Sequence, residues 1–364
     1  GQPIPDKFDN KTSKAMVEEI GERLERISYD DLLEMQEMDS EFVTKLKFYT
    51  LLLFIAFWKK PQLTTLISCR TIQISLEHGV CKYSVFGFVQ YAAIICNLSK
   101  SEEVKYIQEA CRIGKVGMSL LQRFGSPVDI MPKAYLFYYG FVAVYLEPLQ
   151  VCADNMRKSF EVGMSAGDSM LAINSTILSI KISMFAGENL QSCLAEVDYY
   201  LEVMHRFQHK LLLPCLLEFR ETVVFLIGTS AGLKGNFANP LESTSDASQT
   251  KREQSKFMNK MLQSFWRGHS TRCHYYAKKA LGTSIDENFN KLYITWLTAL
   301  NSIRGIKNKN GTGSQLLQVK EIKHAISTLR AAAEISRWNF QNKVYILEAE
   351  MFSFEGKAVD AKAS

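Results

Sequence analysis

The segment from Ser40 to Gly79 reads SEFVTKLKFYTLLLFIAFWKKPQLTTLISCRTIQISLEHG, and it predicts two helices joined at a proline. In its first half, large apolar side chains recur at steps of three and four residues, the spacing of one helix face. These residues are Phe42, Leu46, Tyr49, Leu53 and Phe57. Pro61 ends this helix and suits the first turn of the next. Gly79 can adopt the left-handed conformation that closes a helix. The segment therefore predicts a helix hairpin.

Glycines that can end a helix recur along the chain. Gly125, Gly167, Gly187 and Gly228 each follow an apolar, helix-compatible stretch and predict further helix ends. Upstream, the sequence from Ser28 to Asp31 has the S-x-x-D form of a capping box. Asp39 is expected to cap the helix that starts at Ser40. Strand signals are nearly absent, so these marks predict an all-α chain.

A sequence motif that occurs twice at a fixed interval indicates internal repeats. The string VGMS occurs at 116–119 and again at 162–165, which is 46 residues later, and Gly125 follows Gly79 by the same interval. Small residues are expected where paired helices cross: Gly114, Gly117, Ser159, Gly163 and Ala166. A hairpin of this size exposes an apolar side that only its neighbour can cover. The predicted fold is an α-solenoid of antiparallel helix hairpins, a tetratricopeptide-like superhelix with units longer than the usual ~34 residues.

The domain organisation follows from composition. Residues 1–228 are predicted to form the helical repeat array. Residues 229–255 are rich in Gly, Ser, Thr and Asn and predict a loop or linker. Residues 256–364 are expected to continue the repeats, with helices over 256–281, 286–304, 316–334 and 338–355. The last residues, AVDAKAS, lack a helix cap, which suggests a chain cut from something longer.

Charge and cysteine usage narrow the function classes. The chain has 43 basic and 38 acidic residues, and the resulting charge of +5 is too small an excess to indicate a nucleic-acid binder by itself. One basic block, between residues 251 and 279, fits either a solvated helix face or a surface for an acidic partner or phosphate. Its members are Lys251, Arg252, Lys256, Lys260, Arg267, Arg272, Lys278 and Lys279. Eight scattered cysteines without a CxxC motif predict buried, reduced thiols and a cytoplasmic protein.

The most apolar run, Leu51 to Trp58, reads LLLFIAFW and is too short to cross a membrane, which takes ~20 residues. Lysines flank it at Lys47 and at Lys59. We therefore expect a buried helix and no membrane insertion.

The sequence lacks the common catalytic signatures. The sequence has no GxxxxGK[ST] loop for phosphates and no kinase HRD or DFG motif. His205 and His209 are spaced four apart, as two metal ligands on one helix face would be, but no third ligand is evident. His269, Cys273 and His274 match no common zinc spacing. No catalytic residue, cofactor or metal site is therefore assigned, and the chain is predicted not to be an enzyme.

Aromatic residues crowd the segment from Tyr135 to Tyr145, which is predicted to be helical. Two roles are open: interior packing between hairpins, or a cavity that stacks a small ligand. The residues concerned are Tyr135, Phe137, Tyr138, Tyr139, Phe141 and Tyr145.

Several stretches resemble a known family. The segments 28–39 (SYDDLLEMQEMD), 51–94, 115–125 (KVGMSLLQRFG) and 145–168 look like the region that follows the AAA-type or signal-transduction ATPase module in very large signalling proteins. Near the end, the segment from Trp338 to Met351 resembles the NFxHK-type helix of such arrays, with Asn342 in place of the histidine. Those proteins join a protein-kinase-like domain, the ATPase, a tetratricopeptide-like array and often a sensor histidine kinase or a cyclase. The kinase, ATPase and cyclase motifs themselves are absent here.

The resemblance implies a non-catalytic regulatory and protein-interaction region, which couples an ATPase or kinase module to a protein partner or an output domain. The partner-binding residues are unknown at this stage. Two other hypotheses stay open: a ligand-sensing array with an aromatic cavity near 135–145, and nucleic-acid binding through the basic block at 251–279.

Overall fold

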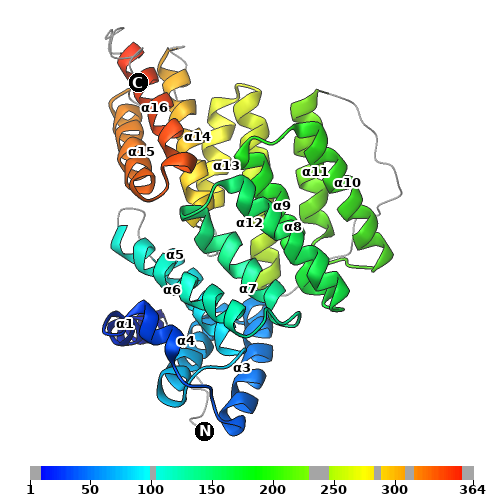
Figure 1. Cartoon of the computed structure of the whole chain (residues 1–364). Helices are drawn as coiled ribbons and strands as arrows, with labels where there is room; N and C mark the ends of the chain where they lie inside the picture. Colours follow the sequence, from blue (N-terminus) through cyan, green and yellow to red (C-terminus); the bar gives the residue numbers. More distant parts are fainter. Residues whose placement is uncertain (1–9, 99–103, 229–245, 283–287, 308–314, 355–364) are drawn as a thin grey trace.

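The computed structural model describes residues 10–98, 104–228, 246–282, 288–307 and 315–354. Within these ranges the chain is all-α and contains no β-strand, which confirms the predicted class (Figure 1). The α-helices are α1 (Asn10–Glu25), α2 (Tyr29–Glu34), α3 (Ser40–Lys59), α4 (Pro61–His78), α5 (Ser84–Leu98), α6 (Val104–Arg123), α7 (Met131–Phe137), α8 (Leu149–Ser165), α9 (Ser169–Ala186), α10 (Leu190–Arg206), α11 (Leu213–Ile227), α12 (Asp246–Trp266), α13 (Ser270–Leu281), α14 (Asn288–Lys307), α15 (Gln315–Ile335) and α16 (Arg337–Phe354).

The predicted helix ends at glycine are all confirmed. Five glycines have positive φ angles between 75° and 90°, a conformation that costs glycine little: Gly79, Gly125, Gly167, Gly187 and Gly228. The Ser28 hydroxyl oxygen accepts a hydrogen bond from the Asp31 amide at 3.1 Å, as expected for the cap of α2. Asp39 does occupy the N-cap position of α3, but its side chain makes no capping hydrogen bond, so that prediction was half right.

Helix α3 is less buried than expected. Leu46 and Leu53 are buried in the core. Phe48, Leu51 and Ile55, however, are 59%, 56% and 58% exposed and form one stripe at spacings of three and four residues. The prediction of a wholly buried helix over 51–58 was therefore wrong for Leu51 and Ile55. The side chains of Phe54, Phe57 and Trp58 lie outside the described residues.

Small residues bring paired helices together, as predicted, at four of the five positions. A Cβ atom on Gly117 of α6 would lie 2.7 Å from Val89 Cγ1 of α5, and one on Gly163 would lie 3.1 Å from Ala172 Cβ of α9. Gly114 faces the Tyr138 ring, and the Ser159 hydroxyl shares a 2.8 Å hydrogen bond with Ser175. Ala166 is the exception, because it is an exposed residue beyond the end of α8.

The second helical block begins earlier than predicted. Residues 229–245 of the predicted linker lie outside the described residues, but 246–255 belong to α12 and not to a linker. The run Lys251-Arg252-Glu253-Gln254 consists of good helix formers, which outweigh the serine and threonine nearby. The helix predicted over 256–281 is interrupted at Gly268, whose φ of 73° separates α12 from α13.

The C-terminal helices pack back onto the middle of the chain. The Asn339 side chain of α16 donates to the carbonyl oxygens of Val144 and Glu147 at 2.9 and 2.8 Å, and it accepts from the Leu149 amide at 3.2 Å. The Phe185 ring of α9 stacks on Tyr293 of α14 with centroids 3.7 Å apart. In Figure 1, α15 and α16 lie beside α14, above α5 and α6 of the first half. Contacts in an ideal solenoid join only neighbouring repeats, so the hairpins are confirmed while the open superhelix stays a prediction.

The core explains the remaining sequence features. All eight cysteines are free and buried, as predicted, and burial raises the pKa of the Cys69 thiol to about 12. Among the described residues, α9 is long and apolar enough to cross a membrane, but 67% of it is buried inside the fold. A core helix passes the same length test, so this is weak evidence for a membrane span.

The Asn339 contacts predict that two asparagines of α16 differ sharply in their contribution to stability. Asn339→Ala removes three hydrogen bonds and leaves buried backbone groups unpaired, so we expect unfolding by denaturant to show a loss of about 3 kcal/mol. Asn342→Ala, at an exposed position of the same helix, removes only a long 3.5 Å hydrogen bond from Lys343 and should change stability by less than about 0.5 kcal/mol. Equal effects of the two substitutions would contradict the assigned contacts.

Lys343 of α16 is a buried lysine enclosed by aromatic rings. Its ammonium lies 5.0 Å from the centroid of the Tyr293 ring and 5.6 Å from that of Trp296, and it donates to the Asn339 carbonyl oxygen at 2.7 Å. Burial lowers its pKa from the ordinary 10.5 to about 8. The charged form is therefore less favourable in the folded protein than in the unfolded chain.

This lowered pKa gives stability a defined pH dependence. Between about pH 8 and pH 10.5 the unfolded chain holds the Lys343 proton while the folded protein releases it, so stability rises with pH in that window. The free energy of unfolding of the unmodified chain, relative to Lys343→Met, should increase there by at most about 3 kcal/mol. Parallel denaturant titrations of the two chains measure this. A difference that is flat with pH would show that Lys343 keeps an ordinary pKa.

Candidate partner-binding groove

The aromatic segment at 135–145 serves interior packing. It is not one regular helix, because α7 ends at Phe137 and continues as a π-helical turn to Val142 and a 3₁₀ turn to Tyr145. Phe137, Tyr138 and Tyr145 are buried, and Phe137 packs against Phe86 of α5. This is the first of the two roles considered for these residues.

The histidine candidates do not come together as ligand sets. Helix α10 ends at Arg206, so His205 and His209 do not share a helix face. The His209 Nε2 atom lies 3.0 Å from the Ser169 hydroxyl, and burial lowers the His209 pKa. The Cys273 thiol is buried, whereas His269 is exposed. Within the described ranges, no group of three or more His, Cys, Asp or Glu side chains is arranged to hold a metal ion.

A serine–histidine pair links the C-terminal helices. Ser302 Oγ lies 3.0 Å from His274 Nε2, and His274 Nδ1 lies 3.2 Å from the Ser270 carbonyl oxygen. Nucleophilic catalysis needs a serine that a substrate can reach. Ser302 belongs to α14 and is fully buried, so the pair ties α13 to α14 and offers no reaction site.

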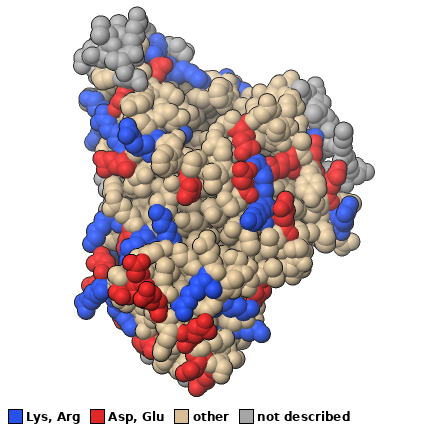
Figure 2. All heavy atoms as spheres, in the orientation of Figure 1, with Lys and Arg blue, Asp and Glu red and all other residues tan. Residues whose placement is uncertain are grey.

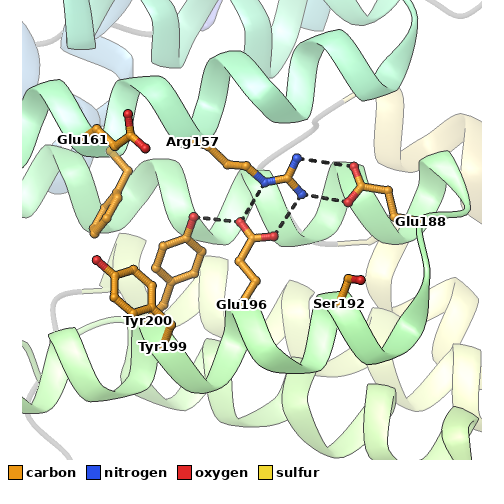
Figure 3. Close-up of a pocket in the computed structure, with 8 residues that line it drawn as sticks. Arg157, Glu161, Glu188, Ser192, Glu196, Tyr199 and Tyr200 are labelled. Carbon is orange, nitrogen blue, oxygen red and sulfur yellow. Dashed lines mark hydrogen bonds and ion pairs between the residues drawn. The ribbon is translucent and has the colours of Figure 1, made fainter.

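An open groove lies between α8 and α10 (Figure 3). It has a volume of about 470 Å³ and is lined by Arg157, Phe160, Glu161, Glu188, Ser192, Glu196, Tyr199 and Tyr200. Helix α8 supplies the first three and α10 the last four, while Glu188 lies in the turn after Gly187. The groove thus depends on the glycine cap that reverses the chain between α9 and α10.

Arg157 is the centre of the groove floor. Its Nε and Nη2 atoms donate to the two carboxylate oxygens of Glu196 at 3.1 and 2.9 Å, a bidentate pair. Nη2 also donates to Glu188 at 2.7 Å and to the Ser183 hydroxyl at 2.8 Å. Burial lowers the pKa of Arg157, but hydrogen bonds to Glu196 and Glu188 outweigh it and raise that pKa overall. The guanidinium is therefore permanently charged and fixed in place.

Glu196 is held by four hydrogen bonds. Besides the two from Arg157, its Oε1 atom accepts from the Tyr200 hydroxyl at 2.7 Å and from the Ser179 hydroxyl at 3.0 Å. The network joins α8, α9 and α10, and Figure 3 shows Arg157 between Glu188 and Glu196 with Tyr200 turned toward Glu196. A side chain so fully bonded cannot rotate freely, so it presents a fixed negative charge to the groove.

The groove combines negative charge with aromatic surface. Arg157 also pairs with Asp154 at 2.7 Å, and Glu161 lies exposed at the rim. One guanidinium thus stands among four carboxylates. Figure 2 shows acidic side chains on both sides of basic ones over this region. Tyr199 is 54% exposed and contacts the Phe160 ring edge to face. Carboxylates and aromatic faces together favour a cation.

Sequence reasoning missed this site. Asp154, Arg157 and Glu161 are visible as neighbours on one helix face at spacings of three and four residues. Glu188 and Glu196, however, reach Arg157 only because α8, α9 and α10 fold against one another. The adjacent tyrosines Tyr199 and Tyr200 were the available local signal, but only the structure shows that the first is exposed and the second buried.

Comparison with known proteins adds no relative: no protein-family model, curated protein or solved structure matches this chain significantly.

The Arg157 network predicts that replacing Arg157 lowers the free energy of unfolding. Arg157→Met leaves Glu188 and Glu196 facing each other without a cation, and because the pair is partly exposed we expect a loss of about 2 kcal/mol in unfolding free energy. Arg157→Lys keeps the charge but not the bidentate geometry, so it should recover only part of this. Lys158→Met, its exposed neighbour, is the matched control and should change little. Similar effects at positions 157 and 158 would refute the role of the network.

Proposed function

We propose that this chain is a non-catalytic protein-interaction region that binds a basic segment of a partner in the groove between α8 and α10. The observation that carries the proposal is the combination of fixed carboxylates with the exposed Tyr199 ring in an open groove. In keeping with the family resemblance, we propose that such a region couples an ATPase or kinase module of a larger cytoplasmic signalling protein to a partner or an output domain.

The physical basis is selective attraction of a lysine or arginine side chain. An aliphatic stem can lie against Phe160 and Tyr199 while the charged head approaches Glu161 and Glu188. Glu188 keeps acceptor capacity, because each carboxylate oxygen has two lone pairs and Arg157 occupies only part of them. An acidic side chain would instead be repelled by the four carboxylates.

A second feature favours an interaction role. The α3 stripe of Phe48, Leu51 and Ile55 exposes three large apolar side chains on one helix face. Contiguous exposed apolar surface commonly marks a contact with another protein. The α3 stripe supports binding to another protein without indicating which kind. The groove indicates in addition that one partner segment is positively charged.

The groove defines a binding prediction. A fluorescently labelled Lys-Gly repeat peptide should bind the chain, and a Glu-Gly repeat of equal length should not bind at this groove. The double substitution Tyr199→Ala with Glu161→Gln should weaken binding of the basic peptide by about tenfold, because it removes one aromatic face and one charge. Fluorescence anisotropy at low salt measures both affinities.

The matched control is Tyr106→Ala with Glu202→Gln, which removes the same groups from exposed positions outside the groove. This control should leave the affinity unchanged. Equal weakening by both double variants would assign peptide binding to general charge and not to the groove. Turnover of ATP by the purified chain, above a heat-denatured sample, would contradict the non-catalytic part of the proposal.

A further inference from the structure

The hairpin of α12 and α13 carries a surface of opposite charge. Six cationic side chains on it are exposed: Lys256, Lys260, Arg267, Arg272, Lys278 and Lys279. None of these six forms an ion pair with another described residue. The side chains of Lys251 and Arg252, the other members of the basic block, lie outside the described residues. We refer to the six as the basic face.

The basic face has few acidic residues near it in the sequence. Between Glu253 and Glu321 the described residues contain no aspartate or glutamate, and the two acids of that interval, Asp286 and Glu287, lie outside the described ranges. Lys256 and Lys260 lie one turn apart on α12, and Arg267 directly follows its last residue, Trp266, at a further seven positions, which together extend about 16 Å at 1.5 Å per residue. The result is an elongated positive stripe.

Aromatic side chains complete this surface. Trp266 is 60% exposed beside Arg267, and Tyr275 is 55% exposed on α13. The Lys279 ammonium lies 5.9 Å from the centroid of the Tyr275 ring, and that of Lys260 lies 5.6 Å from the centroid of the Tyr276 ring, which joins the two helices. Tryptophan, tyrosine and arginine are the residue types that contribute most binding energy at protein interfaces.

We propose that the basic face binds an acidic protein segment, at a site separate from the groove of α8 and α10. Charge complementarity selects an acidic partner. The shape of the surface favours a protein segment over a single-stranded nucleic acid. Proteins that bind single strands guide the nucleic-acid backbone along a basic groove. Here the described cavity of this hairpin, about 320 Å³, lies at its tip by His269 and Arg272 and not along the stripe.

The test uses the full chain, a labelled Glu-Gly repeat peptide and a labelled oligouridine of the same charge. The acidic peptide should bind at about 50 mM salt and weaken at least fivefold at about 200 mM, since salt screens exposed charges. The double reversal Arg272→Glu with Lys279→Glu should weaken it at least tenfold. Trp266→Ala should weaken it about fivefold through lost aromatic contact.

Two controls keep the result interpretable. Lys47→Glu with Lys115→Glu makes the same charge change at exposed positions on α3 and α6 and should leave the affinity within twofold. Tyr199→Ala, in the α8–α10 groove, should have no effect on the acidic peptide, so failure of one site is distinguishable from failure of the other. Absence of binding at low salt, equal loss in the control reversal, or tighter binding of oligouridine than of the peptide would each overturn the proposal.

Discussion

The guanidinium of Arg157 is the constraint on which the candidate site depends. It bonds Glu196 of α10, Glu188 of the preceding turn and Ser183 of α9 from its own place on α8. A single planar cation therefore fixes three helices relative to one another. Because more carboxylates than cations surround it, the same network that stabilises the packing leaves a negative surface facing solvent.

Packing of the rest of the chain places this network in a rigid frame. Close helix crossings at Gly117 and Gly163 need the absence of a side chain, as the short distances to Val89 and Ala172 show. Asn339 ties the last helix to the turn before α8. Along α16, Asn339 makes these contacts, Phe340 is buried near the Tyr145 ring, and Lys343 is enclosed by the aromatic rings of Tyr293 and Trp296. Asn339 and Phe340 hold α16 against the middle of the chain, whereas Lys343 packs it against α14.

The sequence predicted those features of the fold that depend on neighbouring residues along the chain, above all the helix ends. Helix ends at Gly79 or Gly187 follow from the backbone freedom of glycine, which neighbours in space do not alter. The run from Leu51 to Trp58, in contrast, is apolar throughout, so its composition alone predicts burial of Leu51 as well as of Leu53. Only the longer helical period, which groups Leu53 with Leu46 and leaves out Leu51, separates the buried side chain from the exposed one. The start of α12 was missed because serine and threonine near it imitate a linker. The Arg157 network was missed because its partners lie 31 and 39 residues away, and only the tertiary fold brings them together.

The most direct test of the groove follows the Arg157 side chain itself. A Lys-Gly repeat peptide can be titrated into isotopically labelled chain while the Arg157 Nε–H resonance and the amides of Tyr199 and Glu161 are followed by NMR. The account predicts saturable shifts at these positions and none at Trp266 or Lys279. Shifts confined to other helices, or no shifts at the groove when the peptide is bound, would contradict it.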